Sequence, residues 1–369
     1  MKIGVPKEIK NNEFRVGLTP KSVAKLVSCD HEVFIQTNAG AEIGFFDSDY
    51  ENAGASIINS AEELYAQSEL IVKVKEPVPE EFKYLRDDQT VFAYLHLAGD
   101  PVNGLNLTKT GVTGIALETV TADDGSMPLL SPMSEIAGQL GIIVGSYFLL
   151  KPNRGMGTLI GSINDLEPRT ITIIGAGVAG TEAIKKAVDN GAAVKIIDLS
   201  SEKLNLLKDR FGKKNIDYII SSERSIENAI KESDMVIGAV YVIGKQAPKV
   251  IKRPMLKLMK PGTVMVDISI DQGGCFESSR PTTHDDPVYI EEDIVHYCVT
   301  NMPGAVPLTA TESLNKATLP YILELANKGI ETALKENPHL ANGLNIQNGK
   351  IIHESVREAL INTEQINLV

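Results

Sequence analysis

Short hydrophobic runs alternate with amphipathic stretches along most of the chain. The runs are rich in Val, Ile and aromatic residues, which favours buried strands, whereas the stretches between them repeat apolar positions at helical spacing. The first strand-like runs are KIGVP, HEVFIQT, ASIIN, LIVKVK, TVFAYLHL and GVTGIALE, and segments such as PKSVAKLV and SAEELYAQ separate them. This strand–helix alternation predicts a parallel sheet covered by helices.

A second series of the same kind follows a connection rich in Gly, Pro and polar residues, KPNRGMGTLIGSINDLEPR. It opens with TITIIGAGVAGTEAIKKAVDNGAAVKIIDLS and continues through DMVIGAVY, TVMVDISID and YCVTNMPG. The chain therefore predicts two α/β units. A helix-rich tail, TESLNKATLPYILELANKGIETALKENP, comes after them, and the pattern leaves its packing partner open.

The composition bounds the class of protein. A chain of 369 residues with 43% hydrophobic and 23% charged residues is typical of globular proteins and long enough for two domains. A formal charge of −12 without a basic cluster argues against nucleic acid or an anionic membrane as a partner. The most apolar long segment, residues 136–150, is shorter than the roughly 20 residues of a spanning helix and contains Gln139 and Ser146, which predicts a buried helix.

Charge and cysteine usage indicate the compartment. Lys2, Lys7 and other charged residues stand near the beginning, where a secretory signal needs its apolar core. The three cysteines, Cys29, Cys275 and Cys298, lie far apart and form neither a disulfide framework nor a CxxC motif. We therefore expect a cytoplasmic protein.

The strongest local motif is a glycine turn between a strand and a helix. Gly175, Gly177 and Gly180 have G-x-G-x-x-G spacing after the run TITII. They are typical of a tight turn, a close approach of backbone to a pyrophosphate, and close strand–helix packing, respectively. Asp198 follows about 20 residues later, where an acidic side chain binds ribose hydroxyls and repels a 2′-phosphate. The alternative is a tight turn without a ligand, but the full context predicts NAD.

The first unit lacks such a motif, but three of its basic residues lie at the carboxyl ends of predicted strands or in the loop that follows one. Arg15 lies between the first strand and a helix that Thr19 and Pro20 are expected to begin. Lys75 closes LIVKVK, and His96 closes TVFAYLHL. Ligands of open α/β sheets bind outside the carboxyl ends of the strands, so these residues are candidates for a site. Each has a structural alternative, namely a surface ion pair for the arginine and lysine and a hydrogen-bonded structural role for the histidine.

Two aspartates end the predicted strand TVMVDISID in the second unit. Asp267 could cap or pair within the sheet. Asp271, which stands just before two glycines, is the better candidate for a site, with a turn-forming role as the alternative.

Motifs along the whole chain resemble the alanine dehydrogenase family, in the larger group that includes the NAD-binding subunit of proton-pumping transhydrogenase. The motifs are GVPKEIKNNEFRVGLTP, KVKEP, LHLA, SPMSE, GAGVAG, VDISIDQGGCFESSRPTTHDDP and NMPGAVP. The features LHLA, IDQGGCFE and RPTT resemble the alanine dehydrogenase branch in particular.

The resemblance implies two Rossmann-like, doubly wound parallel-sheet domains separated by a cleft, with the NAD domain (131–306) inserted into the substrate domain (1–130 and 307–369). It also implies a homohexamer. Arg15 and Lys75 would bind substrate, and His96 and Asp271 would be catalytic. Beyond the three glycines, the implied cofactor contacts are Ser134, Val178, Ala179, Asp198, Lys203, Ser221, Val240, Tyr241, Ile268, Ser269, Ile270, Asp271, Arg280, Val299, Thr300, Asn301 and Met302. Some members hold a metal through Glu and His one helical turn apart. Here Lys328 stands one turn after Glu324, in the place of the histidine, so no metal is expected.

The implied reaction is NAD-dependent, reversible deamination of L-alanine to pyruvate and ammonium. Arg15 would clamp a carboxylate, Lys75 would add a point charge, and His96 would transfer protons with an ordinary pKa of about 6.5. Asp271 would stabilise a cationic imine or ammonium. The alternatives are a lysine- or opine-type dehydrogenase, a transhydrogenase module that needs a membrane partner, and an NAD-binding sensor without turnover.

Overall fold

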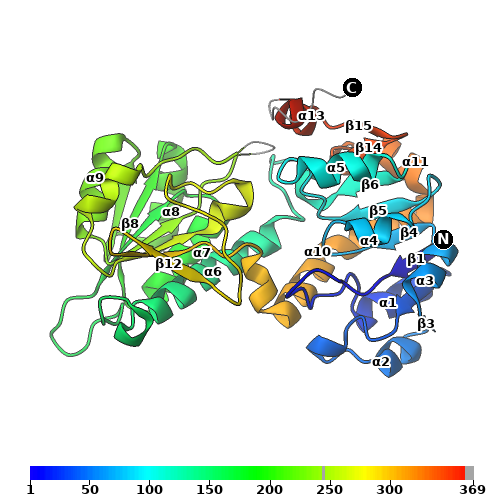
Figure 1. Ribbon diagram of the computed structural model, residues 1–369, viewed down its shortest axis with the longest axis horizontal. Helices are drawn as coiled ribbons and strands as arrows, with labels where there is room; N and C mark the ends of the chain where they lie inside the picture. Colours follow the sequence, from blue (N-terminus) through cyan, green and yellow to red (C-terminus); the bar gives the residue numbers. More distant parts are fainter. Residues whose placement is uncertain (243–245, 362–369) are drawn as a thin grey trace. The chain divides into compact units, whose positions relative to one another are not determined.

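The chain forms two compact units, each built on its own sheet. The computed structural model describes residues 1–242 and 246–361 (Figure 1). One unit comprises residues 1–132 and the described residues from Val306 onward, and the other comprises residues 133–242 and 246–305. Their sheets have eight and seven strands. The prediction of two α/β units with largely parallel sheets is thereby confirmed.

The eight-stranded sheet has the order β15-β14-β6-β5-β4-β1-β2-β3. Its parallel strands are β1 (Lys2–Val5), β2 (Glu32–Gln36), β3 (Ser56–Ile58), β4 (Leu70–Val72), β5 (Thr90–Ala93) and β6 (Thr113–Ala116). Two antiparallel strands, β14 (Leu344–Gln347) and β15 (Lys350–Ile351), extend the β6 edge. The strand order reverses between β1 and β4, and ligands of doubly wound sheets bind at such a switch point.

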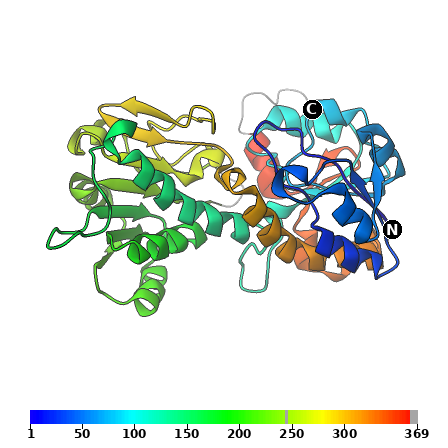
Figure 2. The ribbon, with the colours of Figure 1, turned by 90° about the horizontal axis from the view of Figure 1, so that it is seen from below.

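Helices and short turns cover this sheet. They are α1 (Pro20–Val27), η1 (Ala41–Ile43), α2 (Asp47–Asn52), α3 (Ala61–Gln67), α4 (Pro79–Phe82), α5 (Pro101–Thr108), η2 (Leu117–Thr119), α10 (Pro307–Lys328), α11 (Ile330–Glu336), α12 (Pro338–Ala341) and α13 (Glu354–Ile361). As predicted, Pro20 is the first residue of α1 and Thr19 caps it, accepting the N–H of Ser22 at 3.2 Å. The tail helix α10 packs in this unit, because Asn315 accepts the Thr19 N–H at 2.9 Å. Figure 2 shows α10, in orange, beside the blue segment before α1.

The seven-stranded sheet repeats the same winding, in the order β12-β13-β11-β10-β7-β8-β9. Its parallel strands are β7 (Thr170–Ile174), β8 (Ala193–Asp198), β9 (Ile216–Ile220), β10 (Met235–Gly238), β11 (Val264–Asp267) and β13 (Ile294–Tyr297), and β12 (Val288–Glu291) is antiparallel. The surrounding elements are α6 (Ser131–Phe148), η3 (Lys151–Asn153), α7 (Val178–Asp189), α8 (Ser201–Phe211), α9 (Glu223–Glu232), η4 (Arg253–Leu258), η5 (Ile268–Gln272) and η6 (Met302–Ala305). Its switch point lies between β7 and β10.

Each sheet has an apolar core supplied by its central strands. Ile71 and Val91 lie in the core of the first unit, and Ile174, Val236 and Met265 lie in that of the second. Strands buried on both faces read as continuous hydrophobic runs rather than alternating ones. This burial explains why the runs were visible in the sequence.

Two strands of the first unit are shorter than predicted. LIVKVK forms a strand only up to Val72, and TVFAYLHL only up to Ala93. Beyond these points carboxylates accept backbone N–H groups: Glu8 accepts those of Val74 and Lys75, and Glu118 those of Leu95 and His96. Side chains thus satisfy donors that regular strand pairing would otherwise use.

The prediction of a buried helix for residues 136–150 is confirmed as to the helix, but one face of α6 is exposed. Ile143 and Tyr147, four residues apart, are 48% and 57% exposed. In the described part of the chain, none of the helices combines the length and hydrophobicity needed to cross a bilayer.

Candidate active site

The glycine turn joins β7 to α7 with the geometry that its spacing predicts. Gly175 has a φ of +111°, and a Cβ there would lie 2.3 Å from the Ala239 carbonyl oxygen. A Cβ at Gly180 would lie 1.8 Å from the Gly175 oxygen, so a side chain there would push α7 off the sheet. A Cβ at Gly177 would meet nothing within 4 Å, which leaves space beside the turn. Gly177 also begins α7 without a side-chain cap, so the first N–H groups of the helix point toward that space.

Asp198 ends β8 beside this turn. Its two carboxylate oxygens accept the N–H of Ala176 at 2.7 Å and of Ser200 at 2.8 Å. The side chain therefore fixes the glycine turn as well as facing it. A carboxylate has further lone pairs beyond these two bonds, so it can still accept a ribose hydroxyl.

Most of the other implied cofactor residues follow the carboxyl ends of parallel strands in the same unit. Ser221 follows β9, Val240 and Tyr241 follow β10, Ile268, Ser269, Ile270 and Asp271 follow β11, and Val299, Thr300, Asn301 and Met302 follow β13. Parallel strands end at one edge of a sheet, so these segments share the edge of the glycine turn. Val178 and Ala179 form the first turn of α7.

Hydrogen bonds connect several of these segments. The Ser269 hydroxyl donates to the Val240 carbonyl at 2.7 Å, linking the ends of β10 and β11. The carboxylate of Asp271 accepts the N–H of Asn301 at 3.4 Å, linking the ends of β11 and β13.

Three implied cofactor residues lie on other elements. Ser134 is on α6, where Gly138, one turn later, packs so closely on α7 that a Cβ would lie 2.2 Å from the Ala179 oxygen. Lys203 is an exposed residue in the first turn of α8. Arg280 precedes β12 and stacks on Tyr289, with its guanidinium carbon 4.0 Å from the ring centroid. Its described contacts do not connect Arg280 with the glycine turn.

The two aspartates of the second unit differ in environment. Asp267 is fully buried and accepts the N–H groups of Ser269 and Cys275 at 3.0 and 2.8 Å, so it fixes the turn η5. Burial raises its pKa. Asp271 is exposed within that turn, just before Gly273 at a φ of +84°. The geometry thus gives Asp267 a structural role and leaves the carboxylate of Asp271 accessible for chemistry.

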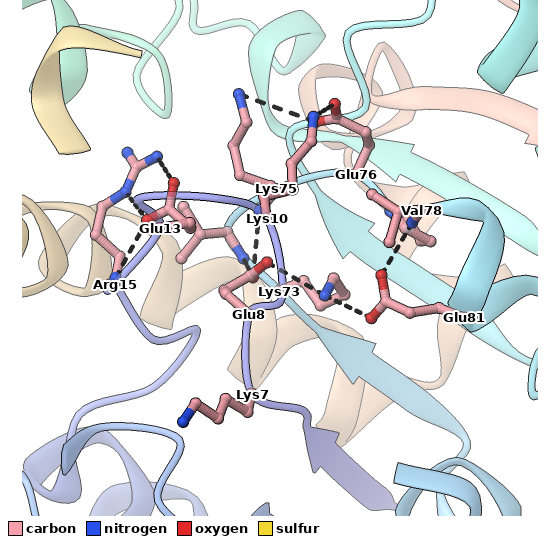
Figure 3. Close-up of polar contacts among 12 residues, drawn as sticks. Lys7, Glu8, Lys10, Glu13, Arg15, Lys73, Lys75, Glu76, Val78 and Glu81 are labelled. Atoms are coloured by element: carbon pink, nitrogen blue, oxygen red, sulfur yellow. Dashed lines mark hydrogen bonds and ion pairs between the residues drawn. The ribbon is translucent and has the colours of Figure 1, made fainter. Parts of the chain in front are cut away.

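In the first unit, Arg15 lies in the β1–α1 loop and is 2% exposed. Glu13 binds its guanidinium side-on, with 2.6 Å to Nε and 2.5 Å to Nη2 (Figure 3). Segment 7–15 also lines a cavity of about 300 Å³ together with Ala39 and Glu42. Glu13 thus occupies the side of the guanidinium that is formed by Nε and Nη2.

Lys75 follows β4 and is buried, with its ammonium 3.9 Å from a carboxylate oxygen of Glu76. Glu76 also forms an ion pair with Lys10 (Figure 3). The segment that carries Lys75 is held by Glu8, which accepts the Val74 and Lys75 N–H groups at 2.7 and 3.3 Å.

A buried ion network lies beneath Lys75. Lys73 contacts Glu8 at 3.2 Å and Glu81 at 2.7 Å, and Tyr65 donates to Glu81 at 2.8 Å. Burial raises the pKa of Glu8. Removing one member of such a network leaves an uncompensated buried charge, so we assign Lys73 to the architecture of the site rather than to its chemistry.

His96 follows β5 and is half-buried. Its ring lies nearly parallel to that of Tyr94, with centroids 5.8 Å apart. Burial, followed by the positive charges of Lys75, Lys10 and Arg15, lowers the pKa of His96 well below its ordinary value. The prediction of an ordinary pKa is therefore wrong, because the sequence does not show that three cations face one ring.

The carboxylates around these basic residues did not stand out as site residues in the sequence. Glu13 binds Arg15, Glu8 holds the Lys75 segment, and Glu118 holds that of His96. Glu13 stands two residues from Arg15 in the motif KEIKNNEFRV, so it was visible as a possible ion-pair partner. Glu118 is distant from His96 in sequence and becomes its neighbour only through the pairing of β5 with β6.

Where some members of the resembling family hold a metal, Glu324 forms an ion pair with Lys328 at 2.9 Å on α10.

Two doubly wound sheets, one with a dinucleotide-type glycine turn and one with clustered basic residues at its switch point, define a two-domain nucleotide-dependent dehydrogenase class. Models of the alanine dehydrogenase/PNT N-terminal and C-terminal domains match residues 4–137 and 141–354. The chain belongs to the alanine dehydrogenase/PNT family.

Relatives and solved structures agree with this assignment. The chain is 47% identical to an alanine dehydrogenase of Halomonas elongata, covering 97% of this chain and 96% of that protein. It is 49% identical to an alanine dehydrogenase of Staphylococcus haemolyticus, with 97% and 96% covered. A solved L-alanine dehydrogenase is 46% identical with a TM-score of 0.92, covering 98% of this chain and 99% of that one. A transhydrogenase from Sinorhizobium meliloti, at 23% identity and a TM-score of 0.80 with 96% and 100% covered, shares the fold.

Proposed function

We propose that the protein catalyses the NAD-dependent, reversible oxidative deamination of L-alanine to pyruvate and ammonium. The observation that carries the proposal is the convergence of Arg15, Lys75 and His96 after β1, β4 and β5, around the switch point of one sheet, in a chain of this family. The test is NADH oxidation with pyruvate plus ammonium, compared with ammonium omitted. Oxidation without ammonium would identify a 2-oxo acid reductase instead.

The residues of the second unit fit a bound NAD. The open side of Gly177, the uncapped start of α7 and the carboxylate of Asp198 match a pyrophosphate and a ribose diol, respectively. When bound, the nicotinamide would accept hydride from the substrate α-carbon. We accordingly propose that residues 131–306 bind the nucleotide and that residues 1–130 with 307–369 bind the amino acid.

The first unit supplies charge to the substrate. Arg15 binds the carboxylate end-on, while Glu13 keeps the guanidinium in place. Lys75 supplies a point charge to the carboxylate and the carbonyl oxygen. Burial and the nearby cations Lys75, Lys10 and Arg15 lower the pKa of His96 and so favour the neutral imidazole. The ring can then accept a proton when water adds to iminopyruvate and return it when the carbinolamine collapses to pyruvate and ammonium.

A change at Asp198 is expected to relax the choice of cofactor. In the wild type, a 2′-phosphate beside this carboxylate is repelled, so kcat/KM with NADH should exceed that with NADPH by a large factor. Asp198→Gly should reduce that ratio, and it should also loosen the glycine turn through the lost Ala176 bond. Steady-state kinetics with both cofactors measures the ratio. Equal efficiency of the wild type with NADPH would contradict the role of Asp198.

A change at Arg15 is expected to affect substrate binding rather than turnover. Arg15→Lys keeps the charge but loses the planar fork that contacts both Glu13 and a carboxylate, so the KM for pyruvate should rise by about 10-fold or more while kcat changes less. Lys21→Arg, on the exposed face of α1, is the matched control. An unchanged KM would show that Arg15 has only a structural role, in its ion pair with Glu13.

Assembly and location are further parts of the proposal. We infer a homohexamer from the family resemblance, and the exposed Ile143 and Tyr147 on α6 offer an apolar contact surface. Sedimentation velocity measures the assembly. We also propose a cytoplasmic location, in keeping with the free Cys29, Cys275 and Cys298, and cell fractionation tests it.

A further inference from the structure

The backbone of His96 has an unusual conformation. Its φ is +47°, in the left-handed region that histidine adopts uncommonly. The conformation turns the chain sharply after β5, and the His96 carbonyl accepts the N–H groups of Gly99 at 2.9 Å and Asp100 at 3.2 Å. Asp100 then caps α5. His96 is thus the pivot between a core strand and the following helix.

Glu118 holds this pivot from the neighbouring strand. It lies in η2 directly after β6, which pairs in parallel with β5. Its Oε1 accepts the His96 N–H at 2.7 Å, and both of its oxygens lie 3.2 Å from the Leu95 nitrogen. One half-buried carboxylate therefore satisfies the two successive N–H groups at the point where the strand turns.

The contact of Glu118 with His96 runs through the backbone and not through the imidazole. Burial and the cations Lys75, Lys10 and Arg15 lower the pKa of the ring, and Tyr94 stacks beside it. Glu118 therefore acts on the backbone of His96. The left-handed φ of His96 sets the direction of its Cα–Cβ bond and hence the position of the ring.

We propose that Glu118 is a positioning residue that holds His96 in its left-handed conformation and so aims the imidazole at the substrate. The proposal rests on the function proposed above, in which His96 transfers protons. The position of the Glu118 oxygens and their charge can be tested separately. The amide oxygen of a glutamine at this position has the same reach and can accept the His96 and Leu95 N–H groups, whereas the shorter carboxylate of an aspartate cannot reach both.

The test compares Glu118→Gln, which keeps reach and loses charge, with Glu118→Asp, which keeps charge and loses reach. Glu118→Asp should lower kcat by about 10- to 100-fold with little change in the KM for pyruvate, because displacement of a catalytic group by about 1 Å can cost about 100-fold. Glu118→Gln should retain kcat within a few-fold. A matched control is Glu69→Ala, which removes a carboxylate that accepts the Lys2 N–H at 2.7 Å, at the amino-terminal end of the central strand β1 in the same sheet.

Crystal structures of both variants provide a readout that does not depend on turnover. In Glu118→Asp the φ of His96 should leave the left-handed region or its ring should move, and in Glu118→Gln both should stay. Unchanged kcat and geometry in Glu118→Asp would overturn the proposal. A loss of kcat in Glu118→Gln as large as or larger than that in Glu118→Asp would also overturn it, because the reach of the side chain would then not be what matters. If the wild type shows no turnover of alanine, the proposed function fails while the crystal structures still decide whether Glu118 positions His96.

Discussion

Replacement of His96 by alanine is expected to lower kcat by about 10²- to 10⁴-fold while pyruvate and NADH still bind. The variant keeps the charges of Arg15 and Lys75 that are proposed to contact the substrate carboxylate, but it loses the proposed proton acceptor for each addition and collapse step. The stacked contact with Tyr94 is also lost, so thermal unfolding is measured alongside to confirm that the variant folds. Single-turnover kinetics separates binding from the chemical step.

The pH dependence of the wild type should report the depressed pKa of His96. Because burial, Lys75, Lys10 and Arg15 disfavour the imidazolium, the neutral base persists to lower pH than an ordinary histidine with a pKa of about 6.5 allows. In the deamination direction, the acid limb of kcat/KM that belongs to this ring should therefore fall below that value, and it should be absent in the alanine variant.

His353→Ala is the matched control for this prediction, since burial also lowers the pKa of His353 in the same unit. This control should keep the wild-type kcat and pH profile. A His96→Ala variant that folds and keeps both would show that the histidine is structural and that the proposed mechanism is wrong.

Features encoded by a few adjacent residues could be predicted from the sequence. Thr19 caps the helix that Pro20 begins, because a hydroxyl at that position reaches the N–H of the first turn. The glycine turn has its expected geometry for a similar reason, since the positive φ of Gly175 and the contact of Gly180 follow from local sterics. The continuous apolar runs marked most of the parallel strands.

Features that depend on distant partners could not be predicted. The strands of LIVKVK and TVFAYLHL end early because Glu8 and Glu118, far away in sequence, accept their N–H groups. The pKa of His96 depends on cations from two loops. The hydrophobic period shows which residues face a core, but it carries no information on which carboxylate meets which amide.

The same distinction applies to the two aspartates after β11. Their spacing left both as candidates, and the structure separates them through long-range bonds: Asp267 accepts N–H groups from Cys275 and Phe276, and a hydroxyl from Ser279. These partners stabilise a buried carboxylate. Asp271 instead contacts the edge of the sheet at Asn301.

Replacement of Asp271 by asparagine is expected to lower kcat by about 10²-fold or more with little effect on NADH binding. Asparagine keeps the size of the side chain and an oxygen that can accept the Asn301 N–H, so the turn η5 should persist. The substitution removes the negative charge proposed to stabilise the cationic imine and ammonium, and loss of a preorganised electrostatic contact with a reacting group can cost about this factor.

Fluorescence titration of NADH and steady-state kinetics in both directions measure the two effects of Asp271→Asn separately. Asp293→Asn, at an exposed turn with a φ of +61° that asparagine also tolerates, is the matched control and should leave both unchanged. If the loss comes from charge, Asp271→Glu should recover part of the kcat of the wild type, because it restores the carboxylate at a shifted position. Near-wild-type turnover of Asp271→Asn would instead assign Asp271 to the turn that Gly273 completes, and the cationic intermediate would then need another counter-charge.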